Sequence, residues 1–304
     1  MQREFNSLLQ LVTAIPDEAA AIEHFTAIRW VNGPFCPLCG SIKVYHFADK
    51  KTHKCGDCRK RFSIKVGTIF EGTKIPLRSW LMAMWLITSH KKGIASTQLA
   101  KDLKVTQKTA WFMLHRLREA AATKSFTQPL KNFVEADETF VGGKKKNMHK
   151  YKREEVKGRG PAGKEMVIGF LERGGEFRAF HVEKGKPFLG AMLAKHVQPG
   201  SNLLTDEFPG YAHMGSNYFH YAVNHSAGEY VRDGFIHCNS VEGAWSLLKR
   251  QIYGIHHWVS PKHLNRYVSE MTWRYNRRSM DEASRLNALI TGSDGRLTYK
   301  ALIA

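Results

Sequence analysis

The sequence predicts a multidomain α/β protein, in which an N-terminal zinc ribbon and a helix-turn-helix precede a mixed α/β domain. Three observations lead to this fold class. Four cysteines form two CxxC pairs near the N-terminus, two helical patterns joined by a tight turn come next, and strand and helix patterns alternate over most of the remaining chain. With 304 residues, 43% of them hydrophobic, the chain is long enough for roughly two domains with buried cores.

The composition is strongly basic. Lys and Arg number 46 against 27 Asp and Glu, which gives a formal net charge of +19. This balance favours a polyanionic partner, because phosphate binding releases counterions, although RNA-binding and membrane-surface proteins share it. No apolar run reaches the roughly 18 residues of a membrane span, and the N-terminus carries acids where a signal peptide has an apolar core. We therefore expect a cytoplasmic protein with no membrane partner.

The cysteine pairs have the spacing of a zinc site. The pattern is C-x2-C-x15-C-x2-C, so two short loops can each present two thiolates to a tetrahedral Zn²⁺, and the residues between them alternate as a hairpin does. The predicted ligands are Cys36, Cys39, Cys55 and Cys58. A redox or disulfide pair is the alternative, which a cytosolic chain disfavours. Because the four thiolates fill the metal's coordination positions, we expect a structural zinc, and we expect the separate Cys238 to be a small buried residue.

A helix-turn-helix is predicted after the ribbon. Apolar residues recur with helical spacing over 80–87. Beyond them Ser96 can cap a short helix, residues 104–105 can form a turn, and Thr106 can cap a longer helix. The start of that longer helix would offer to a DNA major groove Gln107, Lys108, Thr109 and either Trp111 or Phe112. Any three-helix packing unit can show this pattern, so the assignment to DNA depends on the basic composition and the neighbouring ribbon.

The rest of the chain alternates between strand and helix patterns. Strands are predicted over 133–143, over both arms of a hairpin that turns at Gly174 and Gly175, and over 201–208 and 218–225; helices are predicted over 186–197, from 238 and from 261. Three strands, a helix, two strands and further helices describe a mixed sheet covered by helices.

Two acids lie where predicted strands end or cross the sheet. They are Asp137 in "ADET" and Asp206 in "LLTDEF". A carboxylate among apolar neighbours is costly unless it is paired or binds a cation, and Mg²⁺ prefers carboxylate oxygens. The neighbouring Glu135, Glu138 and Glu207 are rival candidates, and solvated acids at strand ends are the alternative reading.

Taken together, these motifs resemble those of a known family. "CPLCG", "HKCGDCRKRFSIKVGTIFEGTKIPL", "ADETFVGGK", "LLTDEFPGY" and "HCNSVEGAWSLLKRQIYGIHHWVSPKHLNRYVSEMTWRYNRR" resemble a bacterial insertion-sequence DDE transposase of the zinc-ribbon group related to the eukaryotic Merlin elements. The resemblance covers roughly residues 20–280. It implies an RNase H-like catalytic domain that uses Mg²⁺, with Mn²⁺ as a substitute, to cleave the transposon end and join its 3′-hydroxyl to target DNA. It also implies double-stranded DNA (element ends and target) as the partner, a homodimer or higher oligomer on DNA, and a nucleoid-associated location.

The resemblance assigns the catalytic acids by position. Asp137 is the first and Asp206 the second, and Glu242 follows with 35 residues between them. Some members of the group are described with asparagine as the third ligand, which leaves Asn239 as the alternative. The pattern Asn239-x-x-Glu242 also fits a capping box. Lys249 lies seven residues after Glu242, on the same helix face, which favours Glu242 as the third metal ligand.

Basic residues follow the first acid. Residues 142–164 hold nine Lys and Arg against two Glu, a net charge of +7. A solvated loop is the usual reading of such a run. Beside a site that holds DNA we prefer phosphate contacts. The candidates are Lys144, Lys145, Lys146, Lys150, Lys152 and Arg153 here, and Lys249 and Arg250 on the later helix. The residues 256–258, His-His-Trp, can stack on a base, but a surface turn before a helix is the simpler expectation.

The leading hypothesis is a DNA transposase that binds terminal inverted repeats and catalyses metal-dependent cleavage and strand transfer. The alternatives are a catalytically silent DNA-binding regulator derived from a transposase and an RNase H-type nuclease or resolvase. The predicted organisation is an N-terminal helical segment (1–30), a zinc ribbon (31–73), a helix-turn-helix (74–124), an RNase H-like catalytic domain (130–290) and a C-terminal tail (291–304).

Overall fold

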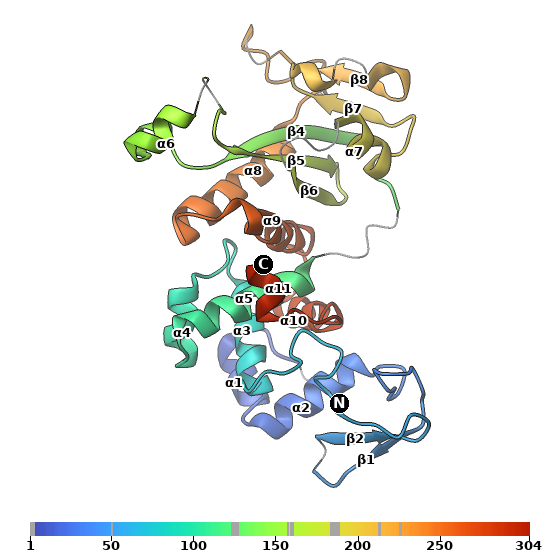
Figure 1. The fold of residues 1–304 in the computed structure, drawn as a ribbon. Coiled ribbons are helices and arrows are strands. Elements are labelled where there is room, and N and C mark those ends of the chain that lie inside the picture. Colours follow the sequence, from blue (N-terminus) through green and yellow to red (C-terminus); the bar gives the residue numbers. More distant parts are fainter. Residues whose placement is uncertain are drawn as a thin grey trace. The chain divides into compact units, whose positions relative to one another are not determined.

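The chain divides into two compact units. The computed structural model describes residues 4–49, 51–122, 128–156, 158, 161–182, 189–211, 214–224 and 227–304. One unit comprises Met1–Thr123 together with Ser279–Ala304, and the other comprises Lys124–Arg278 (Figure 1). Among the described residues, none of the helices has the length and apolar character needed to cross a lipid bilayer.

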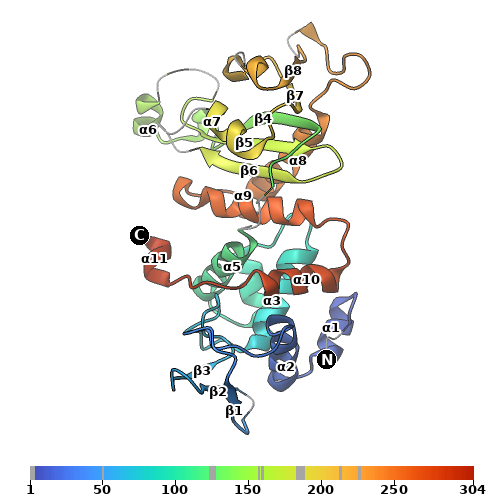
Figure 2. The same cartoon turned by 90° about the vertical axis from the view of Figure 1, so that its right-hand side faces the viewer.

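The first unit begins with two helices and a small sheet. The helices are α1 (Leu8–Ala14) and α2 (Glu18–Arg29), and the antiparallel strands are β1 (Val44–His46), β2 (Thr52–Cys55) and β3 (Arg61–Ser63), in the order β1-β2-β3 (Figure 2). The strands β1 and β2 lie between the two cysteine pairs. The hairpin predicted there is therefore confirmed.

Three more helices follow the ribbon. They are α3 (Leu77–Ser89), α4 (Ser96–Leu103) and α5 (Gln107–Ala121). The apolar stripe predicted for the first of these is buried, with Trp80 and Leu81 almost inaccessible to solvent. The turn between α4 and α5 is made by Lys104, whose φ of 51° and ψ of 47° are left-handed and end α4.

The N-terminal cap of α5 matches the sequence prediction, whereas the N-terminal cap of α4 does not. Thr106 caps α5, since its hydroxyl accepts a hydrogen bond from the backbone N–H of Thr109 at 3.2 Å. The prediction that Ser96 caps α4 is wrong. Helix α4 already begins at Ser96, preceded by Ala95, and the Ser96 hydroxyl accepts a hydrogen bond from Nε2 of Gln107 at 2.9 Å. This hydroxyl therefore joins α4 to α5.

The C-terminal segment belongs to the first unit. Helix α10 (Glu282–Thr291) packs against α2, α3 and α5. The backbone N–H of Ile69 donates to the carbonyl of Ser293 at 2.8 Å, and α11 (Tyr299–Ile303) places the Tyr299 ring on Phe112 of α5. Residues 279–290, which the sequence-based bounds assigned to the second domain, thus pack within the first unit.

The second unit is built on a five-stranded mixed sheet. Its strands are β4 (Phe133–Val141), β5 (Glu165–Glu172), β6 (Phe177–Val182), β7 (Asn202–Thr205) and β8 (Phe219–Ala222), in the order β6-β5-β4-β7-β8. Strands β4, β5 and β6 are antiparallel, whereas β4, β7 and β8 are parallel. The predicted hairpin between β5 and β6 is confirmed, and Gly174 in its turn has a φ of +73°, which glycine adopts without strain.

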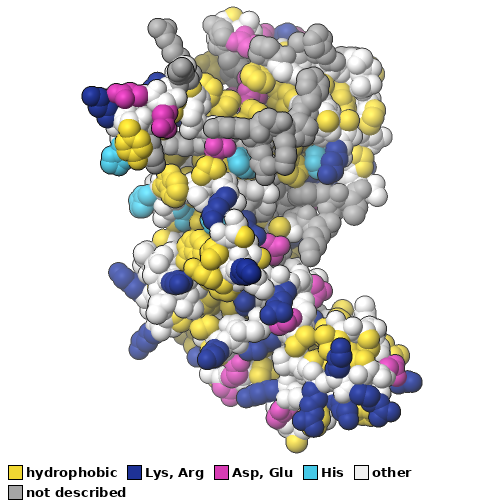
Figure 3. Space-filling view, in the orientation of Figure 1, with side chains coloured by type: hydrophobic (Ala, Val, Ile, Leu, Met, Phe, Trp, Pro, Cys, Tyr) yellow, Lys and Arg dark blue, Asp and Glu magenta, His cyan; other side chains and the backbone are white. Residues whose placement is uncertain are grey.

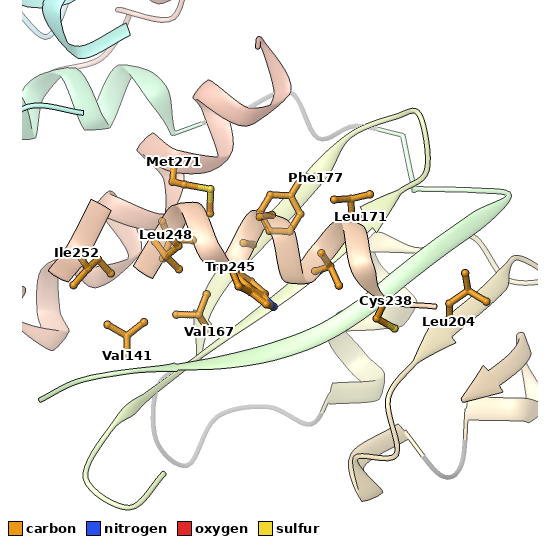
Figure 4. Close-up of a cluster of buried hydrophobic side chains, with 14 of the residues drawn as sticks. Val141, Val167, Leu171, Phe177, Leu204, Cys238, Trp245, Leu248, Ile252 and Met271 are labelled. Atoms are coloured by element: carbon orange, nitrogen blue, oxygen red, sulfur yellow. The ribbon is translucent and has the colours of Figure 1, made fainter. Parts of the chain in front are cut away.

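Helices cover both faces of this sheet. Helix α7 (Leu189–His196) covers one face, and α8 (Asn239–Gln251) and α9 (Pro261–Asn276) cover the other. Helix α6 (Lys150–Glu155) is exposed where its side chains are described. Short 3₁₀ turns lie at Lys145–Asn147, Pro209–Tyr211 and Met214–Ser216, and a π-helical turn, η5, lies at Ile252–His256. Residues 186–188 of the predicted helix before β7 lie outside the described part. Alternating strand residues face opposite ways: Val167 packs with α8 and α9 (Figure 4), and Ile168 packs with α7. The predicted mixed α/β architecture is confirmed.

A glycine admits the largest side chain of α8. Gly169 of β5 pairs with Asp137 of β4, and a Cβ built at Gly169 would lie 2.6 Å from the Trp245 ring and 2.8 Å from the Phe177 ring. Real Cβ atoms do not approach so closely. The missing side chain at Gly169 thus allows Trp245 to lie against the sheet beside Asp137.

We predict that Gly169→Ala destabilises the second unit by about 1–3 kcal/mol, because the new methyl group overlaps Trp245 and the core must shift. Denaturant unfolding followed by tryptophan fluorescence measures this loss. Gly243→Ala is the matched control: Gly243 lies on α8 with open space around a built Cβ, so alanine should be neutral or stabilise the helix. Equal stability of Gly169→Ala and wild type would contradict the close packing.

Candidate active site and zinc centre

Two of the predicted acids lie on neighbouring parallel strands. Strand β4 pairs with β7 in a register that sets Glu135 opposite Leu204. Continuing this register by two residues sets Asp137 beside Asp206, which directly follows the last residue of β7, Thr205. Because β7 ends there, the edge of β4 is open at Asp137, and side chains from both of its faces can reach the end of β7.

Three carboxylates meet at this point. Oxygen atoms of Asp137, Glu138 and Asp206 all lie within 4.8 Å of one another. Successive strand residues point to opposite faces, so Glu138 approaches from the side of Tyr211, whose hydroxyl donates to Glu138 Oε2 at 3.4 Å. Asp206 Oδ1 accepts a hydrogen bond from the backbone N–H of Phe208 at 2.9 Å. The donor set is therefore all-oxygen and acidic, which suits a hard divalent cation.

The crowding of these acids changes their protonation. Burial, followed by the charge of Asp206, raises the pKa of Asp137 to about 7, while N–H groups of Glu138 and Trp245 act in the opposite direction. Burial and the charges of Asp206 and Asp137 raise the pKa of Glu138 to about 8. The site thus holds more negative charge than its own hydrogen bonds compensate, and a divalent cation would compensate it.

A fully buried carboxylate fixes the start of α8. Oε2 of Glu135 accepts hydrogen bonds from the backbone N–H groups of Ser240 at 2.9 Å and Val241 at 3.0 Å, and Oε1 accepts from the Ser240 hydroxyl at 3.0 Å. Arg173 Nε donates to the same carboxylate at 2.7 Å. A negative charge is favourable at a helix N-terminus, where backbone N–H groups have no partner within the helix. Glu135 therefore ties α8 to the strand that carries Asp137.

Two further contacts hold α8 along β4. Trp245 Nε1 donates to Asp137 Oδ2 at 2.9 Å, and the Tyr253 hydroxyl donates to the Gly142 carbonyl at 3.2 Å and lies 3.3 Å from the Gly142 nitrogen, which donates to it. Together with the Glu135 contacts, these bonds join β4 and the residue after it to α8 and η5 at three positions along the chain, namely Glu135, Asp137 and Gly142. The helix therefore follows the strand in the same direction, with Trp245 between them (Figure 4).

The two candidates for the third ligand both lie exposed on the first turns of α8. Glu242 is close enough to Asp137 that its charge contributes to the raised pKa of Asp137. Asn239 is the first helical residue, and its backbone N–H donates to His237 Nδ1 at 3.4 Å. The predicted capping box is wrong, because the N-cap position is Cys238 and has no side-chain cap. The Glu135 carboxylate, from another element, accepts the hydrogen bonds that a cap would accept.

The four cysteines form a second candidate metal centre. Their sulfur atoms all lie within 4.8 Å of one another, with Cys36 Sγ 3.8 Å from Cys58 Sγ and Cys39 Sγ 3.6 Å from Cys55 Sγ. Tetrahedral Zn²⁺ with Zn–S bonds of about 2.3 Å requires sulfur atoms about 3.8 Å apart. Burial acts to raise the pKa of Cys55, but hydrogen bonds from Cys58 and Asp57 N–H groups and the neighbouring thiols outweigh it and lower that pKa to about 6. This cluster supports a structural zinc.

Comparisons with known proteins match segments of both units. The family model of the transposase zinc-ribbon domain matches residues 16–61, and that of the ISXO2-like transposase domain matches residues 129–276. The chain belongs to the insertion-sequence transposases with a zinc ribbon. The transposase is also 28% identical over 261 residues to the "Uncharacterized protein in transposable element ISH50" of Halobacterium salinarum. The aligned region covers 80% of this chain and 84% of that protein. No solved structure matches the transposase.

The predicted phosphate-binding side chains of the transposase are exposed where they are described. They are Lys144, Lys145, Lys146, Lys150 and Arg153 around α6, and Lys249 and Arg250 at the end of α8; the side chain of Lys152 lies outside the described part, as do Lys157 and Arg159. Lys145 Nζ donates to the Val156 carbonyl at 2.5 Å. A further group of basic side chains covers the zinc ribbon (Figure 3), where Lys43, Arg59, Lys60 and Arg61 are exposed.

The residues at the start of α5 that are predicted to contact DNA bases have partners within the first unit. Gln107 bonds Ser96, and the Thr109 hydroxyl lies 2.8 Å from that of Thr106. Lys108 Nζ lies 5.1 Å from the centre of the Tyr299 ring. Gln107 and Lys108 are nevertheless exposed, whereas Trp111 and Phe112 are half-buried.

Sequence reasoning missed the residues that support the acids. The sequence presents Glu135 only as a rival metal ligand, because its role at α8 depends on a contact across 105 residues of sequence. The sequence presents Glu138 as a rival of Asp137, but the structure places it together with Asp137 and Asp206. Trp245 carried no signal beyond an apolar helical position. The pairing of β4 with β7 would have been needed to find these contacts.

We predict that Asp137→Asn stabilises the metal-free transposase at pH 8. A carboxyl whose pKa is raised by folding contributes stability below its unfolded pKa of 3.8, and this contribution is lost as pH rises through its folded pKa of about 7. Asparagine carries no such charge and keeps one acceptor for its N–H donors, so the gain should be on the order of 1–2 kcal/mol after allowance for solvent. The gain should be smaller at pH 5, where Asp137 is protonated in the folded protein but largely ionised in the unfolded chain, and it should vanish only below the unfolded pKa of 3.8.

Urea unfolding at pH 5 and pH 8, with and without added Mg²⁺, measures this difference. Mg²⁺ should stabilise the wild type more than Asp137→Asn, since the cation compensates the charge that the variant lacks. Glu154→Gln, at an exposed acid of α6, is the control and should show no pH-dependent gain. A variant that is destabilised equally at both pH values would contradict uncompensated charge at Asp137.

Proposed function

We propose that this transposase binds the terminal inverted repeats of its element and catalyses divalent-metal-dependent DNA cleavage and strand transfer. The observation that carries the proposal is the convergence of Asp137, Glu138 and Asp206 within 4.8 Å at the end of β7. Three antiparallel strands followed by two parallel strands, with helices on both faces, support an RNase H-like fold for the catalytic unit.

The residues present fit a divalent metal site. The candidate ligands are carboxylates only, and two of them have pKa values raised by burial and mutual repulsion. Asp137 and Asp206 would hold the metal, with Mg²⁺ as the preferred ion and Mn²⁺ as a substitute. A divalent metal bound there would supply activation of a water or a 3′-hydroxyl and stabilisation of the leaving oxygen of the phosphodiester. The protein positions the carboxylates, and Trp245 orients Asp137 through its N–H group.

The seating of α8 favours Glu242 over Asn239 as the third ligand. Trp245 marks the level of Asp137 on α8, and at about 1.5 Å per residue Glu242 lies about 4.5 Å before it along the axis, whereas Asn239 lies about 9 Å before it. Asn239 also precedes Ser240, which is held at Glu135, two residues before Asp137 on β4. The same face of α8 carries Lys249, two turns beyond Glu242, as a phosphate contact.

Glu138 is a fourth carboxylate for this site. Its oxygen lies within reach of both aspartates, and the Tyr211 hydroxyl orients it. It would serve as an additional metal ligand, because its carboxylate oxygen is of the type that hard divalent cations prefer.

We further propose that the first unit recognises the element ends. The α4–α5 pair, with its left-handed turn at Lys104 and the exposed Gln107 and Lys108, has the form of a helix-turn-helix. The basic surface of the zinc ribbon, which a structural Zn²⁺ would hold in place, would provide phosphate contacts from the same unit. A dimer or larger assembly would be required to join two ends to one target.

Cleavage of the element's own end DNA tests the catalytic assignment. With Mg²⁺ and a labelled end duplex, we expect 3′ nicks from the wild type, and at least about 100-fold less product from Asp137→Ala or Asp206→Ala, since each removes a metal-binding carboxylate. Glu242→Ala should lose activity similarly, while Asn239→Ala should keep most of it. Glu154→Gln should cleave as the wild type does.

Two outcomes would overturn these assignments. Unchanged cleavage in both aspartate variants would exclude the proposed metal site. Loss of cleavage in Asn239→Ala with full activity in Glu242→Ala would reassign the third ligand to Asn239.

A further inference from the structure

A cavity lies where β4 and α8 end. Its volume is about 630 Å³, within the range of small-ligand sites, and its lining includes Lys144, Lys146, Lys164, Tyr253, His257 and Trp258. We call it the Trp258 pocket. It is formed within the second unit by the segment after β4, the start of β5, the π-helical turn η5 and the loop before α9.

The lining of the Trp258 pocket suits an anion that carries a flat ring. Its described residues include three lysines and no carboxylate. The Trp258 side chain is 69% exposed and that of Tyr253 is 43% exposed, so neither ring is needed to fill the core. Lysines bind phosphates and aromatic rings stack on nucleobases, and this combination is typical of sites for single-stranded nucleic acid.

At the rim of the pocket, the Tyr253 side chain and the Trp258 backbone are held by hydrogen bonds. The Tyr253 hydroxyl is held by the backbone of Gly142, which orients its ring. The backbone N–H of Trp258 donates to the His256 carbonyl at 2.7 Å and closes a tight turn around His257, whose φ of 60° and ψ of −43° are strained for a residue with a side chain. The surrounding structure therefore maintains a strained turn that leaves the Trp258 side chain in solvent. Packing of the hydrophobic core does not account for the free energy that this strain costs.

The position of the Trp258 pocket relates it to the acids. Val141, in the pocket wall, is four residues beyond Asp137, or about 13 Å along a strand. Tyr253 is eleven residues beyond Glu242, or about 16 Å along a helix. The distance along the strand and the distance along the helix are similar because α8 runs beside β4 in the same direction. At about 3.4 Å per nucleotide step of a duplex, the pocket is within about four or five steps of a phosphate held at the acids.

We propose that the Trp258 pocket binds an unstacked nucleotide close to the cleaved end of the element, with the base on Trp258 and the adjoining phosphates on Lys144, Lys146 and Lys164. In an intact duplex the faces of each base are covered by its neighbours, so only a base that has left the stack can contact the ring. This inference rests on the proposed function, since it assumes that a DNA end lies at the acids.

Binding to paired and unpaired ends tests the proposal without catalysis. The probes are a fully paired duplex of the terminal repeat and the same duplex with four unpaired nucleotides at the cleaved end, labelled for fluorescence anisotropy. Metal is not added, and no chelator is used, so that zinc stays in the ribbon. The wild type should bind the unpaired end at least about five-fold more tightly, the lower limit expected from stacking one base.

The variants identify the source of this preference. Trp258→Ala should bind both probes equally, Trp258→Phe should keep part of the preference, and Phe219→Ala, at an exposed aromatic residue of β8 outside the pocket, should keep all of it. A double Lys144→Ala, Lys146→Ala variant should weaken both complexes and reduce their salt dependence.

The result that would overturn the proposal is an unchanged preference in Trp258→Ala, which would leave the pocket as a phosphate contact only. Equal binding of both probes by the wild type would overturn it as well. Either result leaves the cleavage assignment untouched, because cleavage by the wild type and its loss in Asp137→Ala are measured separately. Conversely, a Trp258-dependent preference in a protein that does not cleave would support the pocket and refute the catalytic function.

Discussion

The geometry of the acidic site depends on the Glu135 carboxylate. It is fully buried on β4 and accepts the first N–H groups of α8 while it pairs with Arg173. A buried charge is tolerated only where its hydrogen bonds are satisfied, and here backbone, hydroxyl and guanidinium groups satisfy them together. Because these donors come from α8 and from the turn after β5, one side chain sets the position of α8 along β4. Any shift of α8 by one residue would break this set of bonds.

The carboxylates of the acidic site are held by well-packed neighbours, but their negative charges repel one another. Trp245 packs into the core against Gly169 and donates to Asp137, so the same ring stabilises the fold and orients a carboxylate. Around that carboxylate, acids are crowded enough to raise the pKa values of Asp137 and Glu138. Such a site is poor for folding stability and good for binding divalent cations, a common trade-off at functional sites. The Glu135 contacts and the Trp245 packing offset this cost.

Local patterns predicted much of the fold but few of the contacts at the site. The cysteine spacing, the turn at Gly174 and the alternation along β5 depend on neighbouring residues, so they could be predicted from the sequence. The role of Glu135 could not be predicted from the sequence, because its partners Ser240 and Val241 are distant in sequence. The pattern Asn239-x-x-Glu242 instead indicated a local cap. Likewise, strand alternation separates Glu138 from Asp137, and only the end of β7 brings both to Asp206.

The most direct test of the arrangement along β4 is the anomalous diffraction of Mn²⁺ in crystals of the full chain with its end DNA. We expect a manganese peak bound by Asp137 and Asp206 with Glu242 beside it, and Glu135 still holding Ser240 and Val241. A peak bound by Asn239 in place of Glu242, or a Glu135 carboxylate that has left α8 to bind the metal, would contradict the proposal that Glu135 seats the helix and Glu242 completes the site.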